Sequence, residues 1–287
     1  MAAVLRHELS NYFHSFIAYI YCIFMLAFVG VGAMLYNIQS AISNFEYVLA
    51  FVSIGLVVII PVLTMRSISE EKKQKTDQLL FSLPLKTTKI IMGKFLALLI
   101  IFAIPLVIIA FYPLIFAQYG DVYLPTSYGS LVAFFFLGAA MIAVGIFISS
   151  LTENQGIAAG IGIPVFLLSY YSVTLAEYVS STALGSLIVL CIFAILLGFL
   201  LRHLTRMDNF SFGVSIVLIL GMGVVYYINS SLFEGLVPKI MEQLSLFERF
   251  YNFVNGVFDV TGIVFYLTVI VFFLFLSVQS LEKRRYN

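Results

Sequence analysis

Few residue patterns in this chain could support catalysis, metal binding or nucleotide binding. A metalloprotease H-E-x-x-H pattern begins at His7 but has Asn11 where the second histidine is needed. A phosphate-binding loop could be built on Gly93 and Lys94, but Thr88 stands where its first glycine is needed. The serine-hydrolase pattern G-x-S-x-G does not occur in the sequence. We therefore expect no catalytic residue, no metal site and no cofactor in the chain itself.

The cysteines and the charged residues also give no sign of a reactive centre. Cys22 and Cys191 lie in separate apolar runs, so we expect small core residues rather than a disulfide or a ligand cluster. Almost every Asp, Glu, Lys and Arg falls in a predicted loop or at the end of a predicted span. Because a charge at the bilayer centre costs about 2.5–3.5 kcal/mol, proton relays and ion sites are marked by retained intramembrane charges. This distribution argues against an ion-coupled secondary transporter.

Composition indicates a membrane protein. Of the 287 residues, 62% are hydrophobic and 10% are charged, whereas soluble domains are about 45–50% apolar and about 25% charged. The net charge of +1 gives no indication of a nucleic-acid partner. The N-terminus lacks a short apolar run with a small-residue cleavage site, so we expect no removable signal peptide. We predict an all-α, multi-pass protein whose main surroundings are the lipid bilayer.

The apolar runs are long enough to cross a bilayer and predict about eight transmembrane helices. These runs cover residues 15–36, 47–65, 95–116, 128–150, 156–176, 186–201, 213–228 and 262–280. The sixth and seventh runs are barely long enough, so a six-span alternative without the hairpin 186–228 stays open.

The basic residues predict the orientation. Thirteen of the 15 Lys and Arg residues fall in segments that this arrangement places in the cytoplasm, and only Lys239 and Arg249 fall outside. Because Lys and Arg near span ends resist translocation, both termini are predicted to be cytoplasmic. An even number of spans is then required, which both eight and six satisfy.

Residues 1–14 precede the first span and mix charged with apolar residues. Leu5, Leu9, Tyr12 and Phe13 fall on one helical face. This pattern predicts a short interfacial helix lying on the membrane. A simple cytoplasmic tail fits so short a segment equally well.

Residues 66–94 form the one long charged segment and hold seven of the 15 Lys and Arg residues. Ser69 and the two glutamates after it are typical of a helix start, because acidic side chains favour the positive end of the helix dipole. Pro84 would end such a helix. We therefore predict a cytoplasmic hairpin with a rigid helix over 69–83. The alternative is an ordinary solvated connection.

Small residues recur near the start of the fifth predicted span. Gly156 and Gly160 are four residues apart, as are Ala158 and Gly162. This spacing lets helix backbones approach closely in lipid, so Gly156, Gly160 and Gly162 are predicted to pack against another helix. The pattern carries no information about a substrate.

The predicted outer segment 229–260 contains an amphipathic stretch. Within Leu244–Asp259, apolar residues recur at spacings of three and four and predict one helix. That apolar stripe consists of Leu244, Phe247, Tyr251, Val254 and Phe258. A helix resting on the outer leaflet is one interpretation of this stripe.

The charged hairpin also resembles a known family. It has the pattern Arg66-x-Ile68-x-Glu70-Glu71, then Thr76-x-x-Leu79-Leu80-x-x-Leu83-Pro84, then Gly93-Lys94. This pattern is similar to the first cytoplasmic loop of type-two ATP-binding-cassette (ABC) permeases, the membrane subunits of ABC exporters. In that family the loop forms a coupling helix that docks on a separate ATPase. The resemblance implies that coupling falls to Ser69, Glu70, Glu71, Thr76, Leu79, Leu80, Leu83 and Pro84.

The outer segment and the C-terminus carry a second resemblance. The pattern Phe250-x-x-Phe253-x-x-Gly256-x-x-Asp259 and the ending Leu281-Glu282-Lys283-Arg284-Arg285 are similar to gliding-motility-type permeases. Short outer helices before the last span cap the translocation path in the family. The resemblance implies an outer gate helix with Phe247, Phe250, Tyr251, Phe253, Gly256 and Asp259.

Taken as a family member, the chain is expected to be the permease subunit of an exporter in a cell membrane, by resemblance a bacterial plasma membrane. The expected partners are two copies of a cytoplasmic ABC ATPase, which bind ATP and Mg, and a second copy of the permease or a related one. The second and fifth spans are expected to line the path. A membrane scaffold without transport and an intramembrane enzyme remain as alternatives. Peptide, lipid, polysaccharide, drug and ion cargoes all stay open.

Overall fold

The computed structural model describes residues 1–76, 86–205 and 208–286 and divides the chain into two units. Unit 1 comprises Met1–Tyr170 and Arg249–Asn287, and unit 2 comprises Tyr171–Glu248. Every regular element in the described residues is a helix, as predicted.

Unit 1 contains the N-terminal helix, the helices of the membrane core and the C-terminal helix. The elements in it are α1 (Ala2–His14), α2 (Ile17–Ala33), a π-helix (Met34–Gln39), α3 (Glu46–Thr64), α4 (Ser69–Gln74), α6 (Thr87–Ile109), α7 (Tyr112–Phe116), α8 (Leu124–Leu151), the first part of α9 (Gln155–Tyr178), the last part of α13 (Leu246–Val254) and α14 (Val260–Tyr286). Across both units, six stretches of the described residues are long and apolar enough to cross a membrane: Ile17–Gln39, Glu46–Gln74, Thr87–Phe116, Leu124–Leu151, Gln155–Tyr178 and Val260–Arg284.

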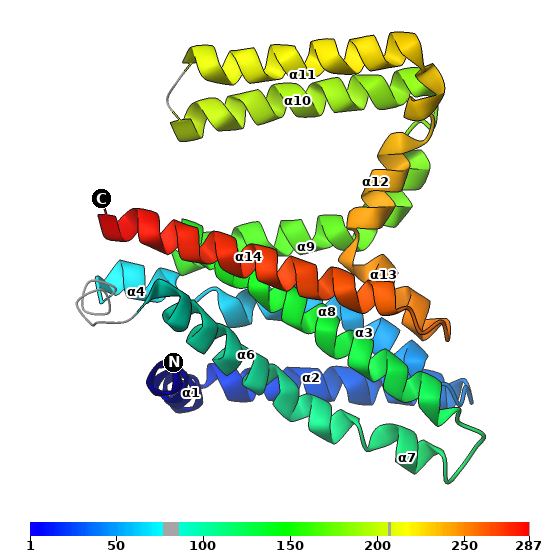
Figure 1. Cartoon of the computed structure of the whole chain (residues 1–287). Coiled ribbons are helices and arrows are strands. Elements are labelled where there is room, and N and C mark those ends of the chain that lie inside the picture. Colours follow the sequence, from blue (N-terminus) through cyan, green and yellow to red (C-terminus); the bar gives the residue numbers. More distant parts are fainter. Residues whose placement is uncertain (77–85, 206–207, 287) are drawn as a thin grey trace. The chain divides into compact units, whose positions relative to one another are not determined.

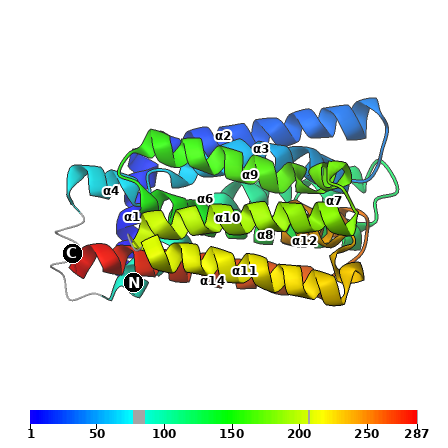
Figure 2. The same cartoon turned by 90° about the horizontal axis from the view of Figure 1, so that it is seen from above.

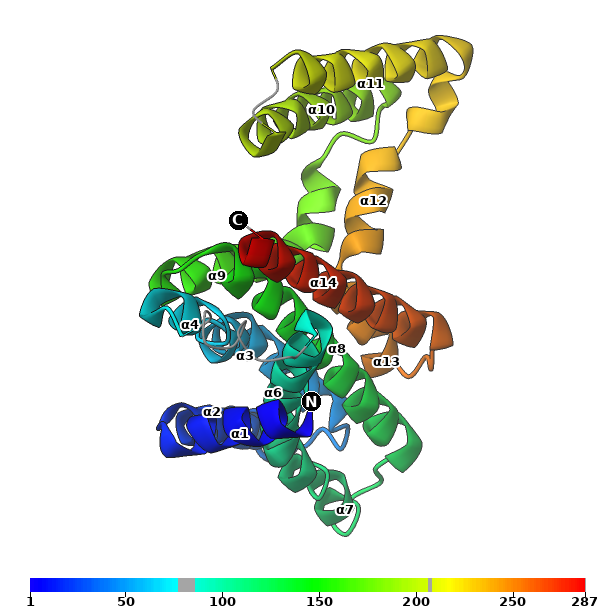
Figure 3. The same ribbon diagram turned by 60° about the vertical axis from the view of Figure 1, so that its left-hand side comes forward.

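Helix α8 lies at the centre of unit 1, packed against α3, α6 and α14 (Figure 3). Two glycines let its neighbours approach closely. A Cβ on Gly138 would lie 2.0 Å from the ring of Phe102 in α6, and a Cβ on Gly145 would lie 2.2 Å from the hydroxyl of Thr64 in α3. Helix association in lipid depends on such close packing, because lipid tails are as apolar as the helices. The small residues of α8 therefore fix its place in the bundle.

Both chain ends lie at the same end of unit 1, together with α4 (Figures 1 and 2). Helix α7 and the start of α14 lie at the opposite end. This arrangement agrees with an even number of spans. It places Arg66 and the N-terminal helix at the end that the basic residues mark as cytoplasmic.

Unit 2 is built on an antiparallel pair of apolar helices, α10 (Ala183–Thr205) and α11 (Asp208–Ile228), seen side by side in Figure 1. The buried hydroxyl of Ser215 donates a hydrogen bond of 3.1 Å to the carbonyl of Ala194 and joins the two helices. A 3-10 helix (Ser230–Phe233) and α12 (Leu236–Leu244) follow.

The number of spans agrees with a multi-pass protein but does not decide whether the hairpin 186–228 crosses the membrane. The predicted runs 186–201 and 213–228 both form helices. Their apolar parts in the described residues, Ala183–Leu196 and Ser215–Ile228, are shorter than those of the six stretches above. Eight spans therefore stay a prediction, and six are the number that the described residues support.

Three boundaries differ from those expected. The helix that begins at Ser69 ends at Gln74 and not at residue 83, because Lys75 adopts a left-handed backbone conformation. Helix α6 begins at Thr87, so the helix that carries the third span starts two turns before Phe95, within the hairpin 66–94. The single helix predicted over Leu244–Asp259 is shorter, since α13 covers Leu246–Val254 and is followed by turns.

Candidate functional site

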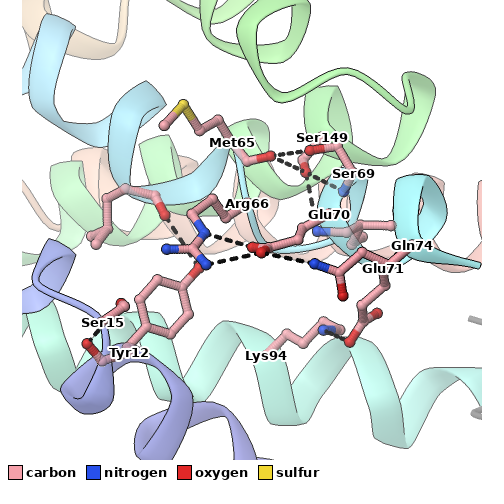
Figure 4. A network of polar contacts seen from close by, with 12 residues as sticks. Tyr12, Ser15, Met65, Arg66, Ser69, Glu70, Glu71, Gln74, Lys94 and Ser149 are labelled. Atoms are coloured by element: carbon pink, nitrogen blue, oxygen red, sulfur yellow. Dashed lines mark hydrogen bonds and ion pairs between the residues drawn. The ribbon is translucent and has the colours of Figure 1, made fainter. Parts of the chain in front are cut away.

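The start of α4 is held by a hydroxyl from α8. Ser149 Oγ accepts hydrogen bonds from the backbone N–H groups of Ile68 and Ser69, each at 3.1 Å, and donates one of 3.0 Å to the carbonyl of Met65. The first N–H groups of a helix have no partner within the helix. The buried hydroxyl of Ser149 therefore pairs with two N–H groups at the start of α4 and with the Met65 carbonyl that follows α3 (Figure 4).

The end of α4 is a tight backbone turn. Thr76 N–H donates to the carbonyl of Glu71 at 3.0 Å, and Lys75 N–H donates to that of Lys72 at 3.3 Å. These two bonds and the left-handed Lys75, with a φ of 58°, form a Schellman motif. A residue with a side chain pays about 1–2 kcal/mol for that conformation. The α4 helix is thus a short, sharply terminated element.

Lys94 of α6 joins α4 to the N-terminal helix. Its ammonium lies 2.6 Å from a carboxylate oxygen of Glu71 in α4 and 2.6 Å from one of Glu8 in α1. Lys94 is 1% exposed and Glu8 is 6% exposed. Breaking a buried ion pair by removing one partner costs about 3–5 kcal/mol, because it leaves an uncompensated charge. The position of α4 is therefore coupled to those of α1 and α6.

Gly93, the neighbour of Lys94, allows α1 to lie directly on α6. A Cβ on Gly93 would lie 2.9 Å from Cγ1 of Val4 and 3.5 Å from the backbone nitrogen of Leu5. Such a contact is too short for any larger residue without a shift of α1. Gly93 therefore allows α1 to approach α6 closely, and the charge of Lys94 holds α1 there through Glu8.

Arg66 and Tyr12 complete the contacts between α1, α3 and α4. The guanidinium of Arg66 donates two hydrogen bonds to Glu70, at 2.5 and 2.9 Å, in a bidentate pair. Tyr12 donates its hydroxyl to the carbonyl of Leu63 at 3.2 Å. Burial, and then the nearby carboxylate of Glu8, raises the pKa of Tyr12 far above its ordinary value. Tyr12 is therefore a permanent hydrogen-bond donor (Figure 4).

The end of α8 receives contacts from α4 and α14. The carbonyl of Ser150 accepts from the ammonium of Lys72 and from the hydroxyl of Ser280, the latter at 3.1 Å. Just beyond α8, Glu153 forms an ion pair of 2.5 Å with Arg284. The hydrogen bond from Arg284, and then its positive charge, lower the pKa of the Glu153 carboxyl. The last carbonyl groups of a helix need such outside donors.

These contacts form one connected group that ties α4 to α1, α3, α6, α8 and α14. We name it the α4 joint, and it consists of Glu8, Tyr12, Arg66, Ser69, Glu70, Glu71, Lys72, Lys94, Ser149, Ser150 and Ser280. Lys94 and Ser150 each have a second partner, so α4 is connected through them to α1 and α14 as well as to α6 and α8.

The structure brings together half of the residues predicted for coupling. Ser69, Glu70 and Glu71 lie in α4 and take part in the α4 joint, and Thr76 lies in the turn that ends it. The other four predicted residues lie outside the described part of the chain: Leu79, Leu80, Leu83 and Pro84.

Sequence reasoning missed the partners that come from other helices. Glu8 belongs to an incomplete metal motif, and Ser149 lies near the end of an apolar run, so neither indicates a partner by its local sequence. Lys94 offered a usable signal, because it is a charge directly before a long apolar stretch and needs a partner if it is buried. Which carboxylates would reach it depends on tertiary structure.

Three of the six predicted outer gate residues are buried. Phe247, Phe250 and Phe253 are at most 2% exposed, and the ring of Phe250 lies 5.7 Å from that of Phe134 in α8. Tyr251 donates its hydroxyl to that of Tyr170 at 3.2 Å.

The predicted single helix is wrong at both ends, because Leu244 is the last residue of α12 and Phe258 follows the turns after α13. The shorter extent of α13 rotates both side chains out of its register. Gly256 ends the segment with a φ of 82°, which favours glycine, and Asp259 accepts a hydrogen bond of 2.8 Å from the N–H of Thr261 at the start of α14. Hydrogen bonding to Thr261, through its side chain first and its backbone N–H second, lowers the pKa of Asp259. A gating role for these residues stays a prediction.

The three predicted packing glycines of α9 differ in their surroundings. A Cβ on Gly162 would lie 3.1 Å from Pro61 of α3. A Cβ on Gly160 would meet nothing within 4 Å, and one on Gly156 would meet only Asn154, whose side chain accepts from the Gly156 N–H at 2.9 Å. Gly162 therefore packs within the chain, while Gly160 leaves open space on α9.

In the residues that the structure describes, no group of three or more His, Cys, Asp or Glu side chains could hold a metal ion. A sequence model of the family described as ABC-2 family transporter protein matches residues 33–178, just over half of the chain. The match runs from the end of α2 through α9 and includes α4, Lys94 and Ser149. No curated protein gave a significant match.

Proposed function

The chain belongs to the ABC-2 family of transporter proteins, and we propose that it is the permease subunit of an exporter driven by a separate cytoplasmic ATPase. Members of this family are the membrane components of transporters, so in this proposal the chain supplies the translocation path and a partner hydrolyses ATP. The finer assignment to the gliding-motility-like group stays an expectation, because the match is to the family as a whole. The export direction is likewise part of the proposal.

The α4 joint is the observation that carries the proposal. A permease that binds no nucleotide itself needs an element that receives movement from the ATPase and passes it to the spans. Helix α4 suits this role, because its side chains and backbone contact α6 and α8 directly. Through Lys94 and Ser150 it is also connected to α1 and α14. Packed interfaces respond to a displacement by rearranging as rigid parts rather than by bending. Closure of the ATPase would then move α4, and α6 and α8 with it.

In this mechanism ATP and Mg bind to the ATPase, and the permease residues hold and transmit position. Ser149 keeps the start of α4 attached to α8. Lys94 of α6 keeps the middle of α4 in place through Glu71, and it contacts α1 through Glu8. The working assembly would contain two ATPase copies and either a second copy of this permease or a related one, in a cell membrane. The path would run at the interface between the permeases, near α3 and α9.

The proposal is tested by purifying the tagged chain in mild detergent from cells that make it and assaying the eluate for ATP hydrolysis. The expected result is a stoichiometric ATPase that co-elutes with the chain. A matched pair of variants then tests the site: Glu71→Leu, in the α4 joint, and Glu282→Leu, on the half-buried end of α14. We expect Glu71→Leu to reduce ATPase recovery or ATP-driven transport, and Glu282→Leu to keep both.

A clean preparation without an ATPase, obtained under conditions that preserve other membrane complexes, would contradict the proposal. Equal ATPase recovery and equal transport in Glu71→Leu and wild type would contradict the assignment of coupling to α4. Insertion and folding of both variants are checked by size-exclusion elution in detergent, so that loss of the partner is not confused with loss of the chain.

A further inference from the structure

The end of unit 1 that carries α4 sorts its charges into a neutral interior and a basic surface. Three carboxylates and three basic groups belong to the α4 joint: Glu8, Glu70, Glu71, Arg66, Lys72 and Lys94. Their formal charges cancel. The two ion-pairing carboxylates of α4, Glu70 and Glu71, point toward Arg66 and Lys94 and not toward the lysines outside.

Four exposed lysines surround this interior, and we name them the basic surface: Lys73, Lys75, Lys86 and Lys89. In the described part of the chain, none of the four is ion-paired to a carboxylate. Lys73 and Lys75 lie at the end of α4, and Lys86 and Lys89 lie at the start of α6. The contact between Glu71 and Lys94 joins α4 to α6 two turns after the start of α6.

The two lysines of α6 stand where a helix disfavours them. Lys86 is the N-cap of α6 and Lys89 lies in its first turn, which contains no acidic residue. The N-terminus of a helix carries the positive end of the dipole, so cations there are destabilising and anions are stabilising. An anionic group from outside the described chain would compensate both the dipole and the lysines.

Position along α6 favours a protein as the source of that anion. The long apolar run of α6 begins at Phe95. At a rise of about 1.5 Å per residue, Lys89 lies about 9 Å and Lys86 about 13 Å before Phe95 along the helix. The headgroup layer on each side of a bilayer is about 5–8 Å thick. Lys86 would therefore extend past the headgroups into the space where a cytoplasmic subunit docks.

We infer that the basic surface binds an acidic surface on the ATPase subunit, an inference that rests on the proposed function. Charge complementarity of this kind steers association and fixes the register of two subunits. In this inference the α4 joint transmits movement, and the four lysines of the basic surface bind the ATPase.

The inference is tested by the salt dependence of ATPase binding to the full-length chain in detergent. Two variants alter the α6 lysines, Lys86→Gln/Lys89→Gln and Lys86→Glu/Lys89→Glu. The control is Lys239→Glu, an exposed lysine on α12 in the predicted outer segment. We expect binding about threefold weaker for the Gln variant, about tenfold weaker for the Glu variant and unchanged for the control. The differences should shrink at 0.5 M NaCl, where charges are screened.

The Gln variant keeps the test informative, since it removes charge without adding the acidic residues that could disturb membrane insertion. Equal binding and equal salt dependence in wild type and both variants, with the ATPase present, would overturn the inference and leave the proposed function intact. Absence of the ATPase from wild type would instead count against the proposed function.

A lipid source of the anion is distinguished by repeating the measurement in vesicles. In vesicles of phosphatidylcholine alone, which carry no net charge, the variants should still bind the ATPase more weakly than wild type. If the difference appears only when phosphatidylglycerol is added, the lysines contact anionic headgroups and the inference is wrong.

Discussion

Replacing Lys94 with methionine should destabilise the protein through the two carboxylates that it leaves behind. Glu8 keeps 8% of its side-chain surface and Glu71 keeps 21%. Water can therefore solvate Glu71 in part, and the main cost falls on Glu8. Loss of one partner of a buried pair costs about 3–5 kcal/mol, and the partial exposure of Glu71 points to the lower end of that range.

The expected change is measurable by thermal unfolding in detergent. At about 2–4 °C per kcal/mol for a chain of this size, Lys94→Met should lower Tm by about 10 °C. The control Lys283→Met, at an exposed position on α14, should change Tm by no more than about 2 °C.

A double-mutant cycle isolates the interaction from the loss of side-chain packing. The variants are Lys94→Met, Glu8→Leu and the two together. Because the double variant leaves no unpaired charge between α1 and α6, it should be more stable than the sum of the single effects by about 2–3 kcal/mol. Additive effects would show that Glu8 and Lys94 do not interact, and would refute the coupling of α1 to α6.

Three further predictions concern the neighbours of Lys94. Gly93→Leu should displace α1, lower the free energy of unfolding by about 1–3 kcal/mol and speed proteolysis of the N-terminal helix, whereas Gly93→Ala should have a smaller effect. Equal protease sensitivity of wild type and both variants would contradict the close packing of α1. Ser149→Ala should cost about 1–3 kcal/mol in thermal melts because it leaves two buried N–H groups without an acceptor, and an unchanged Tm would count against that contact. Lys75→Gly should raise stability by about 1 kcal/mol by relieving the left-handed backbone, and a loss of stability would show that the Lys75 side chain makes a needed contact.

The sequence was sufficient for the class of fold, because the bilayer imposes a strong and local signal. Apolar runs of about 20 residues must form helices in lipid, where every backbone group has to be bonded within the segment. The helix start at Ser69 was also predictable from the serine and the two glutamates after it, since capping and dipole effects act within one turn.

The extent of α4 was not predictable from the same rules. Pro84 suggested the end of the helix, but Lys75 ends it nine residues earlier through a backbone conformation that its type disfavours. Local rules place glycine or proline at the end of a helix, so they do not predict that a lysine adopts the left-handed conformation that ends α4.

The long-range contacts of the site were beyond sequence reasoning for a different reason. Ser149 lies about 80 positions after the N–H groups that it accepts from, and Glu8 lies 86 positions before Lys94. A serine at the end of an apolar run and a glutamate in a short amphipathic helix each have an ordinary local explanation. Only the packing of α1, α6 and α8 shows that they share one site.

The most direct test of the central claim is site-specific cross-linking in intact cells. A photo-reactive amino acid is placed at Thr76, in the turn that ends α4, and as a control at Lys239 in α12. If α4 receives movement from a separate ATPase, the Thr76 position should cross-link to that ATPase and the Lys239 position should not. An ATPase that co-purifies with the chain but is never cross-linked from Thr76, while the variant remains active, would contradict the claim.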